Sequence, residues 1–326
     1  MKLLVTGAAG KVGQVFLPKF LASGAFRGWS LVALCNNRMI EGGARVDVLR
    51  GSIADESVID RAMDGVTHVL HMAAVKESPG MAIDVSIKGM FVMLERFRRL
   101  ETARQFVLVG GDCSVGHMFQ DYPAPITEEA PRKAYPGCYA LTKILEEVML
   151  EQYQFQYGVN GCVLRAPWIM DKDDLKYALS FGLDQFGGPS WGELIGDEDL
   201  QTFRKGNHVP LMRDVTGAPL RRNFVHVDDL VAAILAALDN PKAHQALFNI
   251  SMNEPVCYGR LAHYLAVSRG CAVADIPTPF HSNWLDNSKA RHLLGWAPEV
   301  DLEALVDRAW DYRRDAKDPR TVWYPG

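Results

Sequence analysis

Residues 2–13 read Lys-Leu-Leu-Val-Thr-Gly-Ala-Ala-Gly-Lys-Val-Gly, a short apolar run followed by a loop with three evenly spaced glycines. The apolar run predicts a strand, and the helical periodicity of residues 12–22 predicts a helix directly after the loop. Gly7 permits the tight turn, Gly10 lets the backbone approach a pyrophosphate, and Gly13 lets the helix pack closely on the sheet. Because a helix N-terminus presents unpaired N–H groups to an anion, this stretch predicts a nucleotide-binding loop.

Apolar runs and helical patterns continue to alternate after this unit. Strands are expected at 30–35, 46–49, 67–72, 105–109 and 161–165, and helices at 56–63, 85–100 and 139–157. Such alternation predicts an α/β fold with a doubly wound parallel sheet (Rossmann-like), whose ligands lie at the carboxyl ends of the strands. After Arg165 the chain becomes rich in Gly, Pro and aromatic residues, which predicts a smaller, discontinuous C-terminal substrate-binding cap.

The domain boundary is not a single cut. We expect a dinucleotide-binding domain at 1–166, a substrate cap at 167–222, a return to the first domain at 223–252, and the remainder of the C-terminal substrate domain with its tail at 253–326. Asp228 or Asp229 is expected to cap the helix that follows residue 226, since Asp is a preferred N-cap residue. The polar stretch from Arg313 onward is expected to be a surface extension.

Composition narrows the range of functions. The 326 residues carry a net charge of -4 without a basic stripe, so we expect no nucleic-acid partner and no membrane-surface binding. No apolar segment approaches the ~20 residues that span a bilayer, and the first strand begins next to Met1, so we expect a cytoplasmic protein. Six cysteines are scattered singly, which suggests neither a metal site nor a disulfide framework.

Tyr139 and Lys143 lie four residues apart within the predicted helix at 139–157. This spacing places both side chains on one face, so the ammonium can lower the pKa of the phenol and allow it to exchange a proton. The pair is therefore the candidate acid/base.

The end of the second strand bears on the choice of dinucleotide. A carboxylate at this point normally binds the ribose hydroxyls and repels a 2′-phosphate, but here Cys35 is followed by Asn36, Asn37 and Arg38. Arg38 could pair with a 2′-phosphate or simply face solvent. We expect NAD(P) binding with a weak preference for NADP.

Taken together, the motifs resemble the extended short-chain dehydrogenase/reductase family of NAD-dependent epimerase/dehydratase type. They are Thr6-Gly-Ala-Ala-Gly-Lys-Val-Gly13, His71-Met-Ala-Ala74, Tyr139-Ala-Leu-Thr-Lys143, Asn223-Phe-Val-His-Val-Asp-Asp229 and Asp286-Asn-Ser-Lys-Ala-Arg-His-Leu-Leu-Gly-Trp296. The resemblance spans nearly the whole chain and implies hydride transfer to or from a nicotinamide, with Tyr139 as acid/base and Lys143 holding the ribose. The cofactor-binding residues that it implies are Gly7, Gly10, Lys11, Val12, Asn36, Arg38, Ser52, Ile53, Ala73, Ala74, Tyr139 and Lys143.

One family feature is missing. The resemblance implies a catalytic hydroxyl after the strand at 105–109, yet the chain has Gly111 at the corresponding position. Three replacements are open: Ser114 from a shifted loop, Asp112 as a substitute hydrogen-bonding group, or a water or substrate hydroxyl. We rank Ser114 first as a catalytic residue and keep Asp112 as a substrate-binding candidate, although Asp112 is equally well explained as a turn residue.

The substrate is expected to be a small molecule. The resemblance implies that Arg222 grips a diphosphate, although an exposed arginine ahead of a strand is an equally good interpretation. We therefore expect an NAD(P)-dependent oxidoreductase or epimerase acting on a sugar, sugar-nucleotide or sugar-like substrate, and a homodimer of the family's type. The alternative is a non-catalytic NAD(P)-binding redox sensor or regulator.

Overall fold

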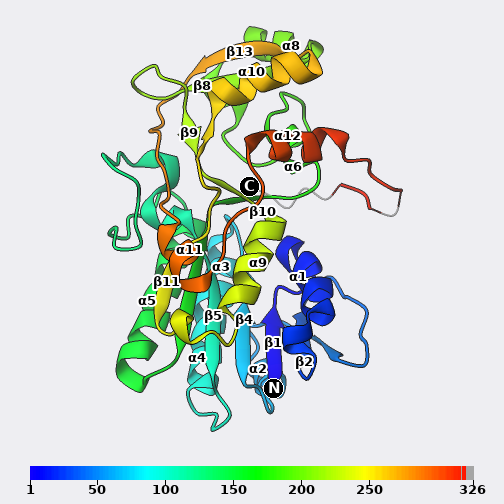
Figure 1. Cartoon of the computed structure of the whole chain (residues 1–326), viewed down its shortest axis with the longest axis vertical. Helices are drawn as coiled ribbons and strands as arrows, with labels where there is room; N and C mark the ends of the chain where they lie inside the picture. Colours follow the sequence, from blue (N-terminus) through cyan, green and yellow to red (C-terminus); the bar gives the residue numbers. More distant parts are fainter. Residues whose placement is uncertain (317, 321–326) are drawn as a thin grey trace.

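The chain is described by a computed structural model that covers residues 1–316 and 318–320 (Figure 1). Its centre is a parallel sheet in the order β11-β6-β5-β4-β1-β2-β3. The strands are β1 (Lys2–Thr6), β2 (Ser30–Cys35), β3 (Val46–Arg50), β4 (His68–His71), β5 (Gln105–Gly111), β6 (Gly161–Ala166) and β11 (Ala246–Asn249). The expected doubly wound parallel sheet is confirmed, and its strand order reverses between β1 and β4, where such folds bind their ligands.

Two layers of helices cover the sheet. The helices α1 (Lys11–Ala22), α9 (Val227–Ala237) and α11 (Ser288–Leu294) share one apolar core with one face of the sheet. The helices α2 (Glu56–Ala62), α4 (Met90–Phe97) and α5 (Cys138–Tyr157) pack on the other face. Nearly continuous apolar strands such as Phe106-Val-Leu-Val109 are explained by this double cover, because both faces are buried.

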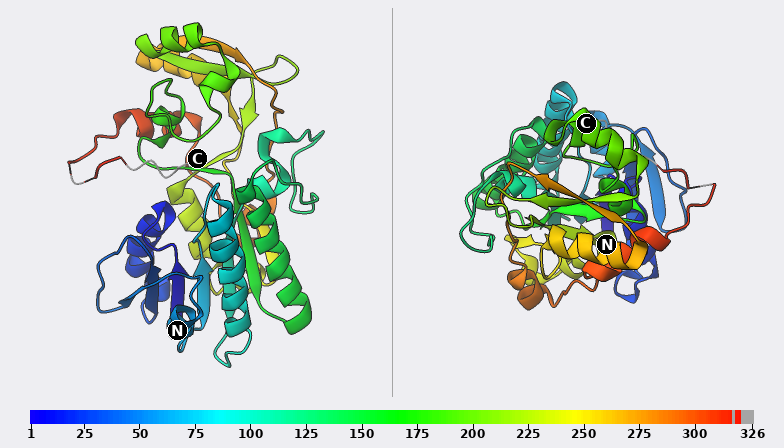
Figure 2. Two further views of the ribbon diagram at one scale, coloured as in Figure 1. Left: turned by 180° about the vertical axis from the view of Figure 1, so that it is seen from behind. Right: turned by 90° about the horizontal axis from the view of Figure 1, so that it is seen from above.

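The cap lies beyond the carboxyl ends of the strands (Figures 1 and 2). Its elements are β7 (Trp168–Met170), α6 (Asp174–Ala178), α7 (Trp191–Leu194), α8 (Asp197–Lys205), β8 (His208–Arg213), β9 (Arg221–Arg222), β10 (Phe224–His226), β12 (Val256–Cys257), α10 (Tyr258–Arg269), β13 (Ala272–Pro277) and α12 (Leu302–Asp311). Three two-stranded pairs, β7 with β10, β8 with β13 and β9 with β12, surround an apolar core of its own. Phe181, Phe186 and Trp191 belong to that core.

Three details differ from expectation. The segment 288–296 packs into the core of the first domain through Ala290, Leu294 and Trp296, and does not belong to the cap. The helix expected at 85–100 begins as a π-helical segment, η2 (Ile83–Gly89), which leads into α4. The N-cap of α9 is His226, whose Nδ1 accepts the Asp228 N–H at 3.2 Å. The carboxylate of Asp229 is instead engaged by the N–H groups of residues 299 and 300.

Among the described residues, no helix combines the length and apolar character that a membrane crossing needs. The remaining short elements are η1 (Gly24–Phe26), α3 (Pro79–Ala82), η3 (Asp112–Val115), η4 (His117–Phe119) and η5 (Pro241–Ala243). Of these, α3, η3 and η4 follow the carboxyl ends of β4 and β5 and therefore help to form the site.

The close approach of α1 to the end of β1 depends on Gly13. A Cβ at this position would lie 2.3 Å from the Ala8 carbonyl oxygen, closer than any real contact. We therefore expect Gly13→Ala to lower the free energy of unfolding by about 1–3 kcal/mol, because backbone has to move to relieve the overlap. Chemical denaturation measures this, with Gly28→Ala as the control, since a Cβ there meets nothing within 4 Å. Equal stability of the two variants would contradict the packing argument.

Candidate active site

The glycine loop forms the first wall of the site. Gly7 has a φ of +73° and lies against the loop that follows β4, where a Cβ would come within 2.9 Å of the Ala73 nitrogen. Gly10 is the N-cap of α1 and provides no side-chain cap for the helix. The first N–H groups of α1 therefore have no side-chain cap, and the glycine loop before them fits a pyrophosphate.

Thr6 joins this loop to the end of β4. Its Oγ1 lies 2.7 Å from His71 Nδ1 and accepts the N–H groups of Met72 and Ala73 at 3.2 and 3.3 Å. Burial lowers the pKa of His71 to about 3, with a further contribution from the Lys143 charge, so the imidazole is neutral. The backbone at Ala73 and Ala74 is thereby held beside the glycine loop, where the sequence placed cofactor contacts.

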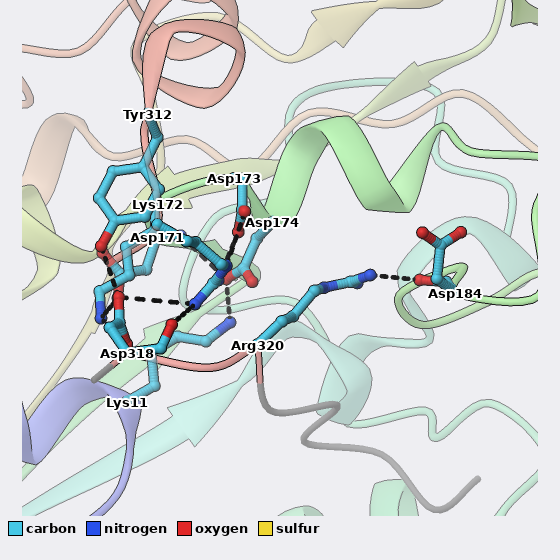
Figure 3. Close-up of polar contacts among 10 residues, drawn as sticks. Lys11, Asp171, Lys172, Asp173, Asp174, Asp184, Tyr312, Asp318 and Arg320 are labelled. Carbon is cyan, nitrogen blue, oxygen red and sulfur yellow. Dashed lines mark hydrogen bonds and ion pairs between the residues drawn. The ribbon is translucent and has the colours of Figure 1, made fainter. Parts of the chain in front are cut away.

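The side chain of Lys11 is turned toward the cap. Its Nζ donates to Asp174 Oδ2 at 2.5 Å (Figure 3). It also donates to the Ile169 carbonyl at 3.1 Å and lies 4.5 Å above the ring of Phe186. The ammonium is thus bound to the cap, because the buried Asp174 carboxylate needs a cation. A cofactor contact at Lys11 therefore falls to its backbone N–H group.

The stretch after α12 folds back onto the same part of the cap. Arg314 pairs with Asp173 at 2.5 Å, and Asp318 accepts from Lys172 at 2.9 Å and from the Tyr312 hydroxyl at 2.5 Å (Figure 3). The described part of the expected surface extension is thus anchored by ion pairs. Residues 317 and 321–326 of that expectation lie outside the described residues.

Asn36 and Arg38, two of the residues predicted to bind the cofactor, follow β2 and are exposed. Ser52 accepts the Ala54 N–H at 3.2 Å, and Ile53 is buried against Gly89. These four residues lie beyond the carboxyl ends of β2 and β3, which is the position that an adenine and its ribose take in this fold.

Tyr139 and Lys143 lie on the first turns of α5, on the face that meets the sheet. The Lys143 Nζ donates to the Val109 carbonyl at 3.1 Å and pairs with Glu146 at 2.8 Å. It lies 5.9 Å from the centre of the Tyr139 ring. Burial raises the pKa of Glu146, which is fully buried. The structure thus brings the two expected residues together and adds Glu146 as a counter-charge.

Lys76, on the loop after β4, was not among the predicted site residues. Its Nζ lies 3.7 Å from the centre of the Tyr139 ring, closer than that of Lys143. Burial lowers the pKa of Lys76 to about 8, and the Lys143 charge adds to this effect. Two ammonium groups therefore lie close to the Tyr139 ring, 3.7 and 5.9 Å from its centre, and both favour the phenolate over the phenol.

Glu77 fixes the start of α5. The N-cap residue Gly137 makes no side-chain cap, and the Glu77 carboxylate accepts the Cys138 N–H at 2.9 Å in its place. A carboxylate at a helix N-terminus is favoured by both the open N–H groups and the helix dipole. The loop after β4 thereby holds Tyr139 from two sides, through Lys76 at the ring and Glu77 at the backbone.

The structure contradicts the expectation that Ser114 supplies the missing hydroxyl. Ser114 is fully buried, and its Oγ lies 2.8 Å from both the Gly111 carbonyl and Glu147 Oε1. Glu147 is two turns beyond Tyr139 on α5, about 12 Å along the helix axis. The buried Glu147 carboxylate has recruited the hydroxyl, so Ser114 is structural.

Asp112 follows β5 directly, next to Gly111, whose Cβ position would lie 3.8 Å from Lys143 Cγ. Its Oδ2 lies 2.6 Å from His117 Nδ1, and His117 Nε2 accepts from Arg222 Nε at 3.0 Å. The two expected substrate-binding residues are thus joined through a histidine that the sequence reasoning missed. The only sequence signal was a histidine in the glycine-punctuated loop that carries Asp112.

Comparison with known proteins agrees with this architecture. The model of the NAD dependent epimerase/dehydratase family matches residues 3–169. The chain is 27% identical over 337 residues to UDP-glucose 4-epimerase of Mycolicibacterium smegmatis, covering 97% of this chain and 99% of that protein. It is 25% identical over 347 residues to UDP-glucuronate 4-epimerase 4 of Arabidopsis thaliana, covering 92% and 72%.

Two solved structures share the fold. A short-chain dehydrogenase/reductase superfamily protein from Agrobacterium tumefaciens with bound NAD superposes with a TM-score of 0.78 at 23% identity, covering 95% of this chain and 96% of that one. UDP-glucuronic acid 4-epimerase from Bacillus cereus in complex with NAD gives 0.73 at 19% identity, covering 96% and 98%.

The fold and its glycine loop define an NAD(P)-dependent enzyme of the extended short-chain dehydrogenase/reductase class. Within that class, the chain belongs to the NAD dependent epimerase/dehydratase family.

The contact between Lys76 and Tyr139 predicts a change in the titration of the phenol. Below about pH 8 the Lys76 ammonium is charged and favours the phenolate, so Lys76→Met should move the Tyr139 midpoint to higher pH. Lys76→Arg keeps the charge and should leave the midpoint at or below its original value. Phenolate absorbance, taken as the difference from a matched Tyr139→Phe variant, measures this without substrate. A midpoint that is unchanged in Lys76→Met and does not fall in Lys76→Arg, whose guanidinium stays charged throughout the titration, would rule out the electrostatic coupling.

Proposed function

We propose that this protein catalyses hydride transfer between NAD(P) and a carbinol or carbonyl carbon of a sugar, sugar-nucleotide or sugar-like substrate, with Tyr139 as the acid/base. The observation that carries this proposal is the placement of Tyr139 and Lys143 at the carboxyl edge of the sheet, across from the glycine cradle. The relatives support the substrate class, because they include UDP-glucose and UDP-glucuronate 4-epimerases.

When bound, the nicotinamide supplies the hydride acceptor or donor. In the oxidation direction, the substrate hydroxyl gives its proton to the Tyr139 phenolate while the hydrogen on the same carbon leaves as hydride, which converts the alcohol to a carbonyl. Lys143 and Lys76 stabilise the phenolate before the proton moves. One N–H of Lys143 donates to the Val109 carbonyl and another contacts Glu146, so the ammonium has a third donor for a ribose hydroxyl.

Asp112 is the residue that best replaces the missing hydroxyl. It lies at the end of β5 beside Gly111, and a carboxylate oxygen accepts a hydrogen bond from a substrate hydroxyl. It cannot donate to a carbonyl while it is ionised, so it orients a hydroxyl next to the reacting carbon. In an epimerase the hydride returns to the opposite face of the same carbon, and in a dehydrogenase the reduced cofactor leaves.

A homodimer remains part of this proposal. Helix α5 and the α3 to α4 segment pack against one another and carry exposed apolar side chains, among them Met81, Phe91, Leu141 and Phe155. A second copy of the chain would bury such a surface through the two long helices. A cytoplasmic location also remains an expectation drawn from the sequence.

The acid/base assignment is tested by Tyr139→Phe. We expect this variant to lose about 10²–10⁴-fold in kcat, because proton transfer from a positioned group accounts for that range. NAD binding, measured by calorimetry, should be kept. The assay follows nicotinamide absorbance and, for epimers, chromatography over free sugars, sugar acids and nucleotide sugars. Tyr157→Phe at the other end of α5 is the control. Unchanged turnover in Tyr139→Phe would refute the assignment. Turnover that the unmodified protein shows and Tyr139→Phe loses would exclude a non-catalytic sensor.

The expected preference for NADP rests on the exposed Arg38 and on Cys35, which ends β2 at the position where a carboxylate would repel a 2′-phosphate. Arg38→Ala should weaken NADP binding about tenfold and leave NAD binding unchanged, because the arginine acts only on the 2′-phosphate. Calorimetric titration with each dinucleotide measures both constants. A preference of the unmodified protein for NAD by a hundredfold or more would end the NADP proposal.

A further inference from the structure

Asp112, His117 and Arg222 form a buried chain of hydrogen bonds between the sheet and the cap. The side chains of Asp112 and His117 are 10% and 8% exposed, and Arg222 is 7% exposed. His117 lies 2.6 Å from Asp112 through Nδ1 and 3.0 Å from Arg222 through Nε2. The carboxylate at the end of β5 is thereby connected to the arginine at the end of β9.

The chemistry of the three groups fixes the proton on His117. An arginine Nε–H can only donate, so His117 Nε2 is the acceptor and carries no proton. The ring proton therefore lies on Nδ1 and is donated to Asp112 Oδ2. A neutral imidazole joins a negative and a positive charge, and the chain as a whole is neutral.

The backbone of His117 is held in place as well. Its φ is +46°, a conformation that L-residues seldom adopt, and it follows Gly116 at +83°. The Asn283 side chain donates to the His117 carbonyl and accepts from Asn223 at 2.7 Å. A strained backbone retained by its own hydrogen bonds indicates that the position of this imidazole is specified by the fold.

Arg222 is engaged on its remaining sides. Its Nη1 donates to the Gly188 carbonyl at 3.2 Å, and the Tyr258 hydroxyl is a further hydrogen-bond partner. The guanidinium carbon lies 4.0 Å above the ring of Trp168 and 5.7 Å from that of Phe224. An arginine so enclosed is a structural cation whose positive charge is balanced by Asp112.

We propose that His117 is a positioning and specificity-determining residue that commits Arg222 to Asp112, so that the site accepts a free sugar, sugar acid or polyol and not a nucleoside diphosphate sugar. This proposal rests on the proposed function and narrows its substrate class. It departs from the diphosphate-binding role expected for Arg222 and from the UDP-sugars named for the relatives.

The physical basis is the cost of breaking this chain. A diphosphate bound by Arg222 would have to displace the imidazole and the Gly188 carbonyl, and it would take from the buried Asp112 carboxylate the arginine charge that balances it through His117. It would also bring its own negative charges toward Asp112, which adds repulsion. A hydroxyl-rich substrate has the opposite effect, because its hydroxyls donate to a carboxylate that His117 holds in place.

The experiment compares free and nucleotide-linked forms of the same sugars. Calorimetry with UDP as the probe, in the presence of NAD, should give a Kd above about 1 mM for the unmodified protein. We would then measure kcat/KM for glucose, galactose, glucuronate and galacturonate and for their UDP derivatives. For the best of the four free sugars, kcat/KM should exceed that of its UDP derivative at least a hundredfold. Micromolar UDP binding that is lost in Arg222→Met, or a preference for UDP derivatives, would overturn the proposal.

Two variants separate positioning from folding. His117→Asn suits the positive φ but is too short to span Asp112 and Arg222, so the free-sugar preference should fall at least tenfold. His117→Gln can still donate to Asp112 and accept from Arg222 through its amide, so it should keep the preference. The exposed His244→Asn is the control for the substitution itself. An unchanged preference in His117→Asn would show that the chain is structural only.

The outcomes also distinguish this proposal from the proposed function. Turnover of UDP-sugars that depends on Tyr139 would keep the function and remove the narrower substrate class. The absence of Tyr139-dependent turnover with either class would remove the function, while UDP calorimetry would still decide whether Arg222 binds a diphosphate.

Discussion

The buried ion pair between Glu147 and Arg165 holds helix α5 against the sheet. Arg165 Nη2 and Nε lie 2.9 and 3.2 Å from the Glu147 carboxylate, and the two side chains are 1% and 0% exposed. Arg132 at 3.1 Å and Ser114 at 2.8 Å complete the carboxylate's contacts. Removal of one partner from such a pair costs about 3–5 kcal/mol, because a buried charge is left uncompensated. Since Lys143 and Tyr139 lie one and two turns earlier on the same face of α5, the pair also sets where the phenol stands.

Charge in the site is concentrated at that phenol. The Lys76 and Lys143 ammonium groups lie 3.7 and 5.9 Å from the centre of the Tyr139 ring, while burial keeps His71, which the Lys143 charge also affects, neutral. Burial also raises the pKa of Cys113 to about 12, so its thiol is protonated and does not compete as a nucleophile. The positive charge of Lys76 depends on pH. Because the pKa of Lys76 is about 8, the ammonium loses its proton as the pH rises through that value. The electrostatic stabilisation of the Tyr139 phenolate is therefore strongest at pH values at which Lys76 is charged.

The sequence predicted the central sheet and the glycine cradle because both depend on local patterns. Continuous apolar runs located the strands and period-3.6 apolar spacing located most helices. Gly13 is required by contacts with Gly7 and Ala8, which lie only a few residues away in the chain. Contacts across loops could not be predicted in this way. Whether Lys76 meets Tyr139 depends on how the loop after β4 packs on α5, and the chain from Asp112 to Arg222 forms only once the cap is placed on the sheet. Ser114 was misjudged for the same reason, since its partner Glu147 is remote in sequence. The segment 288–296 was assigned to the cap because chain order says little about which core a late helix joins.

The order of the strands has a consequence for how the protein is made. β6 is completed at residue 166, but its outer neighbour β11 is not synthesised until residues 246–249, after most of the cap. In the cap, β8 is likewise synthesised well before its partner strand β13 at residues 272–277. A nascent chain that already contains Tyr139, Lys143 and the glycine loop therefore presents β6 as a long apolar edge strand, which is a site for association with other chains. The last third of the sequence thus protects the first two-thirds during synthesis, and a chain that stopped within the cap would expose that edge instead of yielding a smaller working enzyme.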